Sequence, residues 1–154
     1  MEQRYRTVDT RQLLDSYRTL LPEVDTLPVL VSGNSMSPFL IHNRDTVYIT
    51  AVRRPLRVGD IVLYQRDSGA YVLHRICKMG QNSCDIVGDA QTEVERNVRL
   101  DQIFAVVVWA ERKGKKQAPG SFWWEFFEQL WVRMIPLRPV LRRGYGAVGR
   151  LFGR

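Results

Sequence analysis

The chain has 154 residues, of which 45% are apolar and 25% charged, and its formal net charge is +7. These values are ordinary for one globular domain with a hydrophobic core. No stretch reaches the roughly 18 uninterrupted apolar residues of a spanning helix, so none is expected. The excess of positive charge favours an anionic partner, such as a membrane surface or a nucleic acid.

The N-terminus also lacks the apolar core of a secretory signal peptide, and we therefore expect a cytoplasmic chain. In that compartment the two cysteines, Cys77 and Cys84, are expected to be reduced thiols. An oxidised pair across the turn at residues 79–83 is the alternative. Two cysteines and two histidines at unrelated spacings do not form a metal-binding motif, and no cofactor is predicted.

The first predicted element is a helix over residues 10–21. Its apolar residues recur at i, i+1, i+4, i+7 and i+8, which is the spacing of one helix face. Asp9 or Thr10 fits the N-cap, and Pro22 marks the end of the helix. We expect residues 1–27 to pack this helix on the rest of the chain. The residues of the apolar face are Leu13, Leu14, Tyr17, Leu20 and Leu21.

Residues 28–112 form the second predicted unit, a β domain that makes the chain mainly β within the α+β class. Short runs of β-branched and aromatic residues alternate with turn residues, and this pattern is typical of a compact antiparallel sheet. The predicted strands cover residues 27–31, 46–50, 60–66, 70–78, 84–88 and 102–111.

Residues 113–120, with the sequence KGKKQAPG, are predicted to be a hydrophilic linker before an amphipathic, basic tail over residues 121–154. Ser121 fits the cap of an aromatic helix that begins with FWWEFF. One interpretation is that this helix docks on the β domain or on another subunit. The other is that it lies on an anionic membrane surface, where aromatic rings and arginines are favoured. The tail has two glutamates and six arginines, so it is positively charged. The arginines are Arg133, Arg138, Arg142, Arg143, Arg150 and Arg154.

The stretch SGNSMSPFL, residues 32–40, contains three serines among turn-forming residues. A serine hydroxyl needs a base before it acts as a nucleophile, and the chain offers only two histidines. His42 lies in a polar turn, which indicates a solvated side chain. His74 lies inside a predicted strand, where burial lowers the pKa of an imidazole and keeps it neutral.

Period-two alternation along that strand places His74 on one face with Val72 and Ile76, and it places Leu73 and Arg75 on the other face. A lone histidine in such a position also fits a purely structural role.

Carboxylates follow in the run IVGDAQTEVE, which contains Asp89, Glu93 and Glu95. A carboxylate that accepts from the second ring nitrogen of His74 would fix its tautomer and stabilise the imidazolium. Taken alone, Asp89 also fits a turn-capping role.

Four motifs occur in one order along the chain: SGNSMSPFL, RVGDIVLY, YVLHRI and VGDA. Over roughly residues 28–112 this arrangement resembles the signal peptidase and LexA-like superfamily of serine peptidases. The resemblance implies the antiparallel β fold of that superfamily, with Ser35 as the nucleophile and His74 as the general base. Histidine at this position is similar to the endoplasmic-reticulum-type and archaeal branch, whereas bacterial members carry lysine. The resemblance implies Asp89 as the acid, with Glu93 and Glu95 as alternatives.

The same resemblance implies that the backbone N–H of Ser35 donates to the oxyanion, and that an extended peptide or protein substrate binds along the flanking strands. Two features depart from the superfamily pattern. The pair Arg44–Asp45 stands where Gly-Asp is usual, and the transmembrane anchor of family signal peptidases is missing from the sequence.

The sequence therefore predicts a serine endopeptidase that is cytoplasmic or peripheral at the inner face of the membrane. The main alternative is a catalytically silent domain on the same scaffold that binds peptides or recruits a partner to the membrane. A LexA-like self-cleaving regulator fits less well, because the chain has no Ala-Gly or Cys-Gly bond. No specific nucleic-acid partner is expected, since the arginines accompany an aromatic helix rather than a base-reading module.

Overall fold

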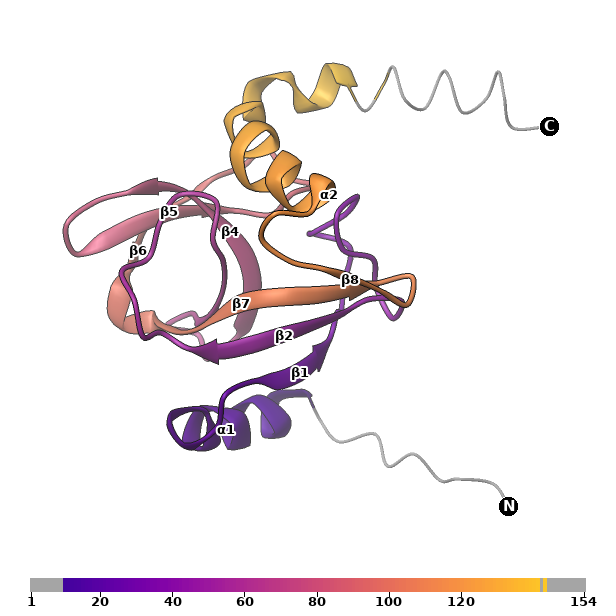
Figure 1. The fold of residues 1–154 in the computed structure, drawn as a ribbon. Coiled ribbons are helices and arrows are strands. Elements are labelled where there is room, and N and C mark those ends of the chain that lie inside the picture. The colour runs from indigo at the N-terminus through magenta and orange to yellow at the C-terminus, as the bar shows by residue number, and fades with distance from the viewer. Residues whose placement is uncertain (1–9, 142, 144–154) are drawn as a thin grey trace.

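The computed structural model describes residues 10–141 and residue 143. This part of the chain forms an eight-stranded antiparallel sheet with short helical segments at both ends (Figure 1). The mainly β architecture within the α+β class is the one that the sequence predicts. The strands are β1 (Leu27–Leu30), β2 (Thr46–Ala51), β3 (Ile61–Gln65), β4 (Tyr71–Met79), β5 (Ser83–Val87), β6 (Glu95–Arg99), β7 (Ile103–Arg112) and β8 (Lys115–Gln117).

All six predicted strands are confirmed, and two strands were missed. Strand β6 has the sequence ERNVR, in which only Val98 is buried, so its composition carries no strand signal. Strand β8 lies within residues 113–120, where a hydrophilic linker was expected. Lys113 and Gly114 both have positive φ angles, 49° and 75°, and reverse the chain so that Lys115 pairs with Arg112. The expected linker is therefore partly a β-hairpin.

The order of the strands in the sheet is β1-β2-β7-β3-β4-β5-β6, and β8 pairs with β7. Buried apolar side chains form two clusters. The first includes residues from α1, from the segment after β1 and from the C-terminal helical segment. The second is formed by side chains of β3 to β7, where the sheet curls (Figure 1). Strand β4 contributes to both clusters, with Leu73 in the first and Ile76 in the second.

The N-terminal helix is confirmed as a packing element. It comprises α1 (Thr10–Leu20) and a 3₁₀ turn, η1 (Leu21–Glu23), on the β1 side of the sheet (Figure 1). Leu14 and Leu21 are buried, and the Tyr17 hydroxyl donates to the Pro28 carbonyl at 2.9 Å. Leu20, predicted on the same face, is instead 46% exposed because the chain changes from α to 3₁₀ geometry at the next residue. The proposed cap Asp9 lies outside the described residues.

The C-terminal segment is helical but irregular. It comprises α2 (Phe122–Glu125), a π turn η3 (Phe126–Leu130), and two 3₁₀ turns, η4 (Trp131–Arg133) and η5 (Ile135–Leu137). The Phe39 ring contacts the rings of Trp124 and Phe127, with centroids 6.0 and 4.9 Å apart. The inner face of the segment is therefore docked on the β domain. Within residues 10–141 and 143, no helix is long and apolar enough to cross a membrane.

The two cysteines are free thiols. In the β4–β5 hairpin, Cys84 pairs with Met79 rather than with Cys77. Burial raises the pKa of the Cys84 thiol to about 11, so this thiol is protonated at neutral pH.

Candidate functional site

The serine-rich stretch at residues 32–40 is a loop that follows β1. Met36, Phe39 and Leu40 are buried, whereas Ser35 is only half-buried. A backbone bond of 2.9 Å from Leu40 N–H to the Met36 carbonyl closes the loop. The three apolar anchors thus hold the loop on the core and leave Ser35 at its surface.

Two groups beyond the loop stabilise its conformation. The His42 side chain accepts from the Gly33 N–H at 2.8 Å through Nδ1, and Gly33 has a φ angle of 82° that favours glycine. The buried carboxylate of Asp45 accepts from the Ile41 N–H at 2.8 Å and from the Arg44 guanidinium. His42 is exposed, as expected, but it also supports the loop, and no sequence signal revealed this contact.

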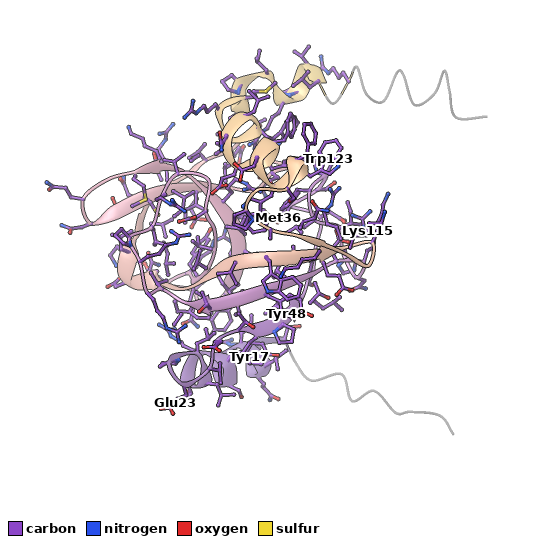
Figure 2. The ribbon with its side chains drawn as sticks, viewed as in Figure 1. Tyr17, Glu23, Met36, Tyr48, Lys115 and Trp123 are labelled. Atoms are coloured by element: carbon purple, nitrogen blue, oxygen red, sulfur yellow. The ribbon has the colours of Figure 1, made fainter. Side chains whose placement is uncertain are left out.

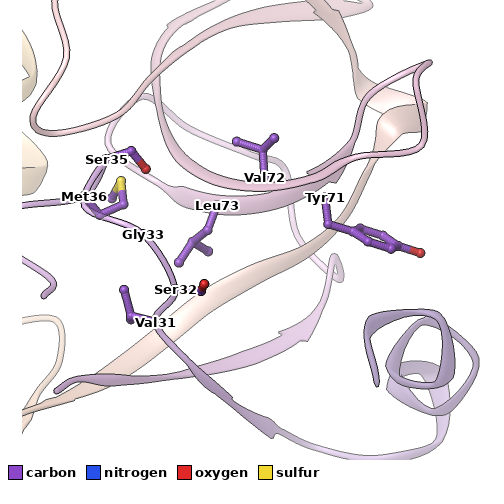
Figure 3. Close-up of a pocket in the computed structure, with 8 residues that line it drawn as sticks. All are labelled: Val31, Ser32, Gly33, Ser35, Met36, Tyr71, Val72 and Leu73. Atoms are coloured by element: carbon purple, nitrogen blue, oxygen red, sulfur yellow. The ribbon is translucent and has the colours of Figure 1, made fainter. Parts of the chain in front are cut away.

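Ser35 lines a small pocket of about 120 Å³. Its hydroxyl points toward β4, where Val72 and Leu73 form the opposite wall (Figure 3). The backbone N–H of Ser35 has no hydrogen-bond acceptor among the described residues. The complete lining is Val31, Ser32, Gly33, Ser35, Met36, Tyr71, Val72 and Leu73.

His74 lies on β4, one residue beyond that wall, and is only 6% exposed. The predicted alternation is confirmed, since Val72 and Ile76 belong to the second core cluster and Leu73 to the first. The pKa of the His74 imidazole is lowered to about 4. Burial is the larger cause, and repulsion from the Arg66 charge is the smaller one. The ring is therefore neutral at pH 7 and able to accept a proton.

The imidazole lines a second, larger pocket of about 490 Å³ beside the first. One wall of this pocket carries Glu95, whose carboxylate accepts from the Tyr64 hydroxyl at 2.5 Å and from Arg66 at 3.0 Å. Burial alone would raise the pKa of Glu95, but these hydrogen bonds outweigh burial and lower it. Glu93 lines the same pocket and is exposed. Both alternative acids thus share the His74 pocket.

Asp89 has a different partner from the one expected. Its two carboxylate oxygens accept from Nε and Nη2 of Arg75 at 2.8 and 2.9 Å, and both side chains are buried. Arg75 points to the face of β4 opposite His74 and lies over the Phe39 ring. Among the described residues, no hydrogen bond joins the His74 ring to a carboxylate. The structure therefore places Asp89 in a buried ion pair rather than against His74.

The loop at residues 88–91 connects the two pockets. The Ala90 N–H donates to the Ser35 carbonyl at 2.9 Å, and Ala90 also lines the His74 pocket. Gly88 approaches so closely that an added Cβ would lie 2.5 Å from the Ser35 carbonyl oxygen. Ser35 and His74 are thus brought to adjoining pockets along β4. No hydrogen bond joins their side chains in the described part of the chain, and such bonds often tighten only when substrate binds.

Comparisons with protein families, curated proteins and solved structures found no match to this chain. The resemblance to serine peptidases therefore rests on the sequence motifs and stays a prediction. Within residues 10–141 and 143, no three His, Cys, Asp or Glu side chains are grouped as a metal site.

The C-terminal segment supports the loop at residues 88–91 through two side chains that sequence reasoning missed. Arg138 is fully buried and donates to the carbonyls of Gly88 at 3.0 Å, Gln91 at 2.8 Å and Trp131 at 3.0 Å. The Trp131 indole N–H donates to the Asp89 carbonyl at 2.8 Å. Arg138 was counted among the arginines available to a membrane, and its burial corrects that expectation.

Replacement of Arg138 by alanine is expected to lower the free energy of unfolding by about 2–3 kcal/mol, because three buried carbonyls lose a charged donor. The exposed Arg133 is the matched control, and Arg133→Ala should change stability by less than about 0.5 kcal/mol. Urea unfolding of both variants measures the difference. Equal stability of the two variants would show that Arg138 does not hold the loop.

Proposed function

We propose that the chain is a serine endopeptidase of the signal peptidase-like superfamily, in which Ser35 is the nucleophile and His74 the general base. The observation that carries the proposal is the position of a buried, neutral imidazole on β4, next to the two residues that face the Ser35 hydroxyl. The bond from Ala90 to the Ser35 carbonyl supports it, since it fixes the nucleophile loop against the His74 pocket.

In the proposed reaction, Ser35 Oγ attacks the scissile carbonyl carbon of a peptide while its proton passes to the His74 ring. The backbone N–H of Ser35, which has no acceptor among the described residues, donates to the oxyanion that forms. The tetrahedral intermediate expels the amine, which takes the proton from His74, and leaves an acyl ester on Ser35. Water attacks this ester with His74 again as base, which releases the acid product and restores the hydroxyl.

The strand register supports an extended substrate. Residues Tyr71, Val72 and Leu73 pair with β3 on one side, whereas the β4–β5 pairing begins only at Arg75. The described strands thus leave one edge of β4 unpaired beside the Ser35 pocket. A peptide added as a strand to this edge would place its carbonyl groups near Ser35, with a small side chain in the pocket.

The experiment that tests the proposal combines a fluorophosphonate with a library of synthetic peptides. The Ser35 oxygen should displace fluoride from the probe, and the mass increment should map to Ser35 by peptide sequencing. New peptide termini should appear in the library by mass spectrometry. Ser35→Ala should abolish both signals, whereas Ser37→Ala, in the same loop but outside the pocket lining, should retain them.

Two outcomes would overturn the proposal. Cleavage that persists in Ser35→Ala would assign the activity elsewhere. Peptides that bind without cleavage, together with no covalent adduct on Ser35, would indicate the silent peptide-binding domain instead. Circular dichroism of Ser35→Ala shows that any loss of signal does not come from unfolding.

A further inference from the structure

The outer face of the C-terminal segment carries large apolar side chains that stay exposed in the described part of the chain. Phe122 is 72% exposed and Trp123 is 47% exposed, although the neighbouring Trp124 is buried. Farther along the same segment, four aliphatic side chains are also exposed. They are Leu130, Leu137, Val140 and Leu141.

Positive charges adjoin the aromatic end of this face. The Arg112 guanidinium lies 5.9 Å from the centre of the Trp123 ring, and this contact joins the β7–β8 hairpin to α2. The turn of that hairpin adds exposed lysines, and its acidic neighbours are Glu111 and the buried Asp45, which accepts from the Lys113 N–H and pairs with Arg44. Figure 2 shows Lys115 at the tip of the hairpin and Trp123 on the same side of the molecule. The lysines that adjoin this face are Lys113 and Lys115, whereas the Lys116 ammonium lies over the Trp109 ring, on the other face of the hairpin.

We propose that this basic aromatic face, formed by Arg112, Lys113, Lys115, Phe122 and Trp123, docks on an anionic lipid bilayer. Aromatic rings with adjacent cations suit the headgroup level, where the ring enters the acyl boundary and the cation stays beside phosphate. The exposed aliphatic residues that follow this face on the same segment favour lipid over nucleic acid, since they offer neither stacking nor hydrogen bonds to bases. Docking on lipid is independent of the proposed peptidase activity.

The experiment measures sedimentation of the full chain with vesicles of phosphatidylcholine alone and of phosphatidylcholine mixed with phosphatidylglycerol. Binding is expected only to the mixed vesicles, and it should weaken as salt is added. The charge reversal Lys113→Glu with Lys115→Glu should weaken binding by about tenfold or more, because two cations near the surface become anions. Lys78→Glu, an exposed lysine on β4, is the matched control and should bind as the wild type.

The apolar contribution is tested with Phe122→Ser and Trp123→Ser together, which should also weaken binding by about tenfold or more. Leu30→Ser is the control, because Leu30 is 54% exposed and lies on β1. Unchanged binding of either double variant would overturn the proposal, as would equal binding to neutral vesicles. Stronger binding to a DNA or RNA duplex than to mixed vesicles, lost in the same variants, would assign the face to nucleic acid and also overturn it.

Discussion

Replacement of His74 by alanine is expected to lower the rate of Ser35 acylation and peptide cleavage by about 10³-fold, while the fold is retained. The reason is that removal of a general base typically costs 10²–10⁴ in rate. The second-order rate of fluorophosphonate labelling measures the effect without knowledge of the natural substrate. A serine hydroxyl without a base is almost fully protonated at neutral pH, so little reaction should remain.

The pH dependence of the wild-type rate gives an independent readout of the same residue. Burial and the Arg66 charge lower the pKa of His74 to about 4, and only the neutral ring accepts a proton. The rate should therefore be constant from neutral pH down to about pH 5 and fall as the pH approaches 4. An ordinary histidine would instead lose activity near pH 6.5.

The other histidine serves as the comparison. His42→Ala removes one hydrogen bond to the Gly33 N–H and should reduce the rate by less than about tenfold. A His74→Ala protein that reacts as fast as His42→Ala would contradict the proposed base. A wild-type rate that falls near pH 6.5 would contradict the burial that sets its pKa.

The fold was largely predictable because its strands carry a local signal. Runs such as TVYIT and IFAVVVWAE combine β-branched residues with clear boundaries, and each forms a strand. The strands β6 and β8 lack that signal, since ERNVR and KKQ pair only because a neighbouring strand presents a free edge. Tertiary pairing of this kind is not encoded in a local pattern.

The site was predicted only in part, for a reason that lies in strand geometry. Alternation along β4 correctly separated the faces of His74 and Arg75. It did not indicate which carboxylate contacts which face of β4. Asp89, expected beside His74, is paired with Arg75 on the other face. Similarly, Arg138 and Arg133 are both arginines on one segment, and only packing against the loop at residues 88–91 distinguishes the buried one.

Among the described residues no carboxylate is hydrogen-bonded to the His74 ring, so the proposed mechanism uses a Ser35–His74 dyad rather than a triad. The lowered pKa of His74 keeps its ring neutral at pH 7. Glu95 is held by Tyr64 and Arg66 within the same pocket, and its charge partly offsets that of Arg66.

Replacement of Asp89 by alanine is expected to lower the free energy of unfolding by about 3–5 kcal/mol. The change leaves the Arg75 guanidinium buried and without its carboxylate, and breaking a buried pair from one side has a cost of this size. Domains of this kind are stable by about 5–15 kcal/mol, so the loss is a large fraction of the total. Urea unfolding at neutral pH measures it.

The matched control is the exposed pair of Arg99 and Asp67, whose side chains are 55% and 79% exposed. Asp67→Ala should leave the midpoint of urea unfolding nearly unchanged, because solvent screens such pairs. Replacing both Arg75 and Asp89 with apolar residues should be less destabilising than Asp89→Ala alone, since no buried charge then remains.

The same variants distinguish a structural Asp89 from one that orients His74. An orienting aspartate would give an Asp89→Ala protein of near wild-type stability whose acylation rate has fallen sharply, as in a triad. A structural Asp89, paired with Arg75, predicts a different result. Asp89→Ala should then mainly lose stability, and the double apolar variant should regain both stability and acylation. Acylation rates measured below the unfolding transition of each variant therefore decide which role Asp89 has.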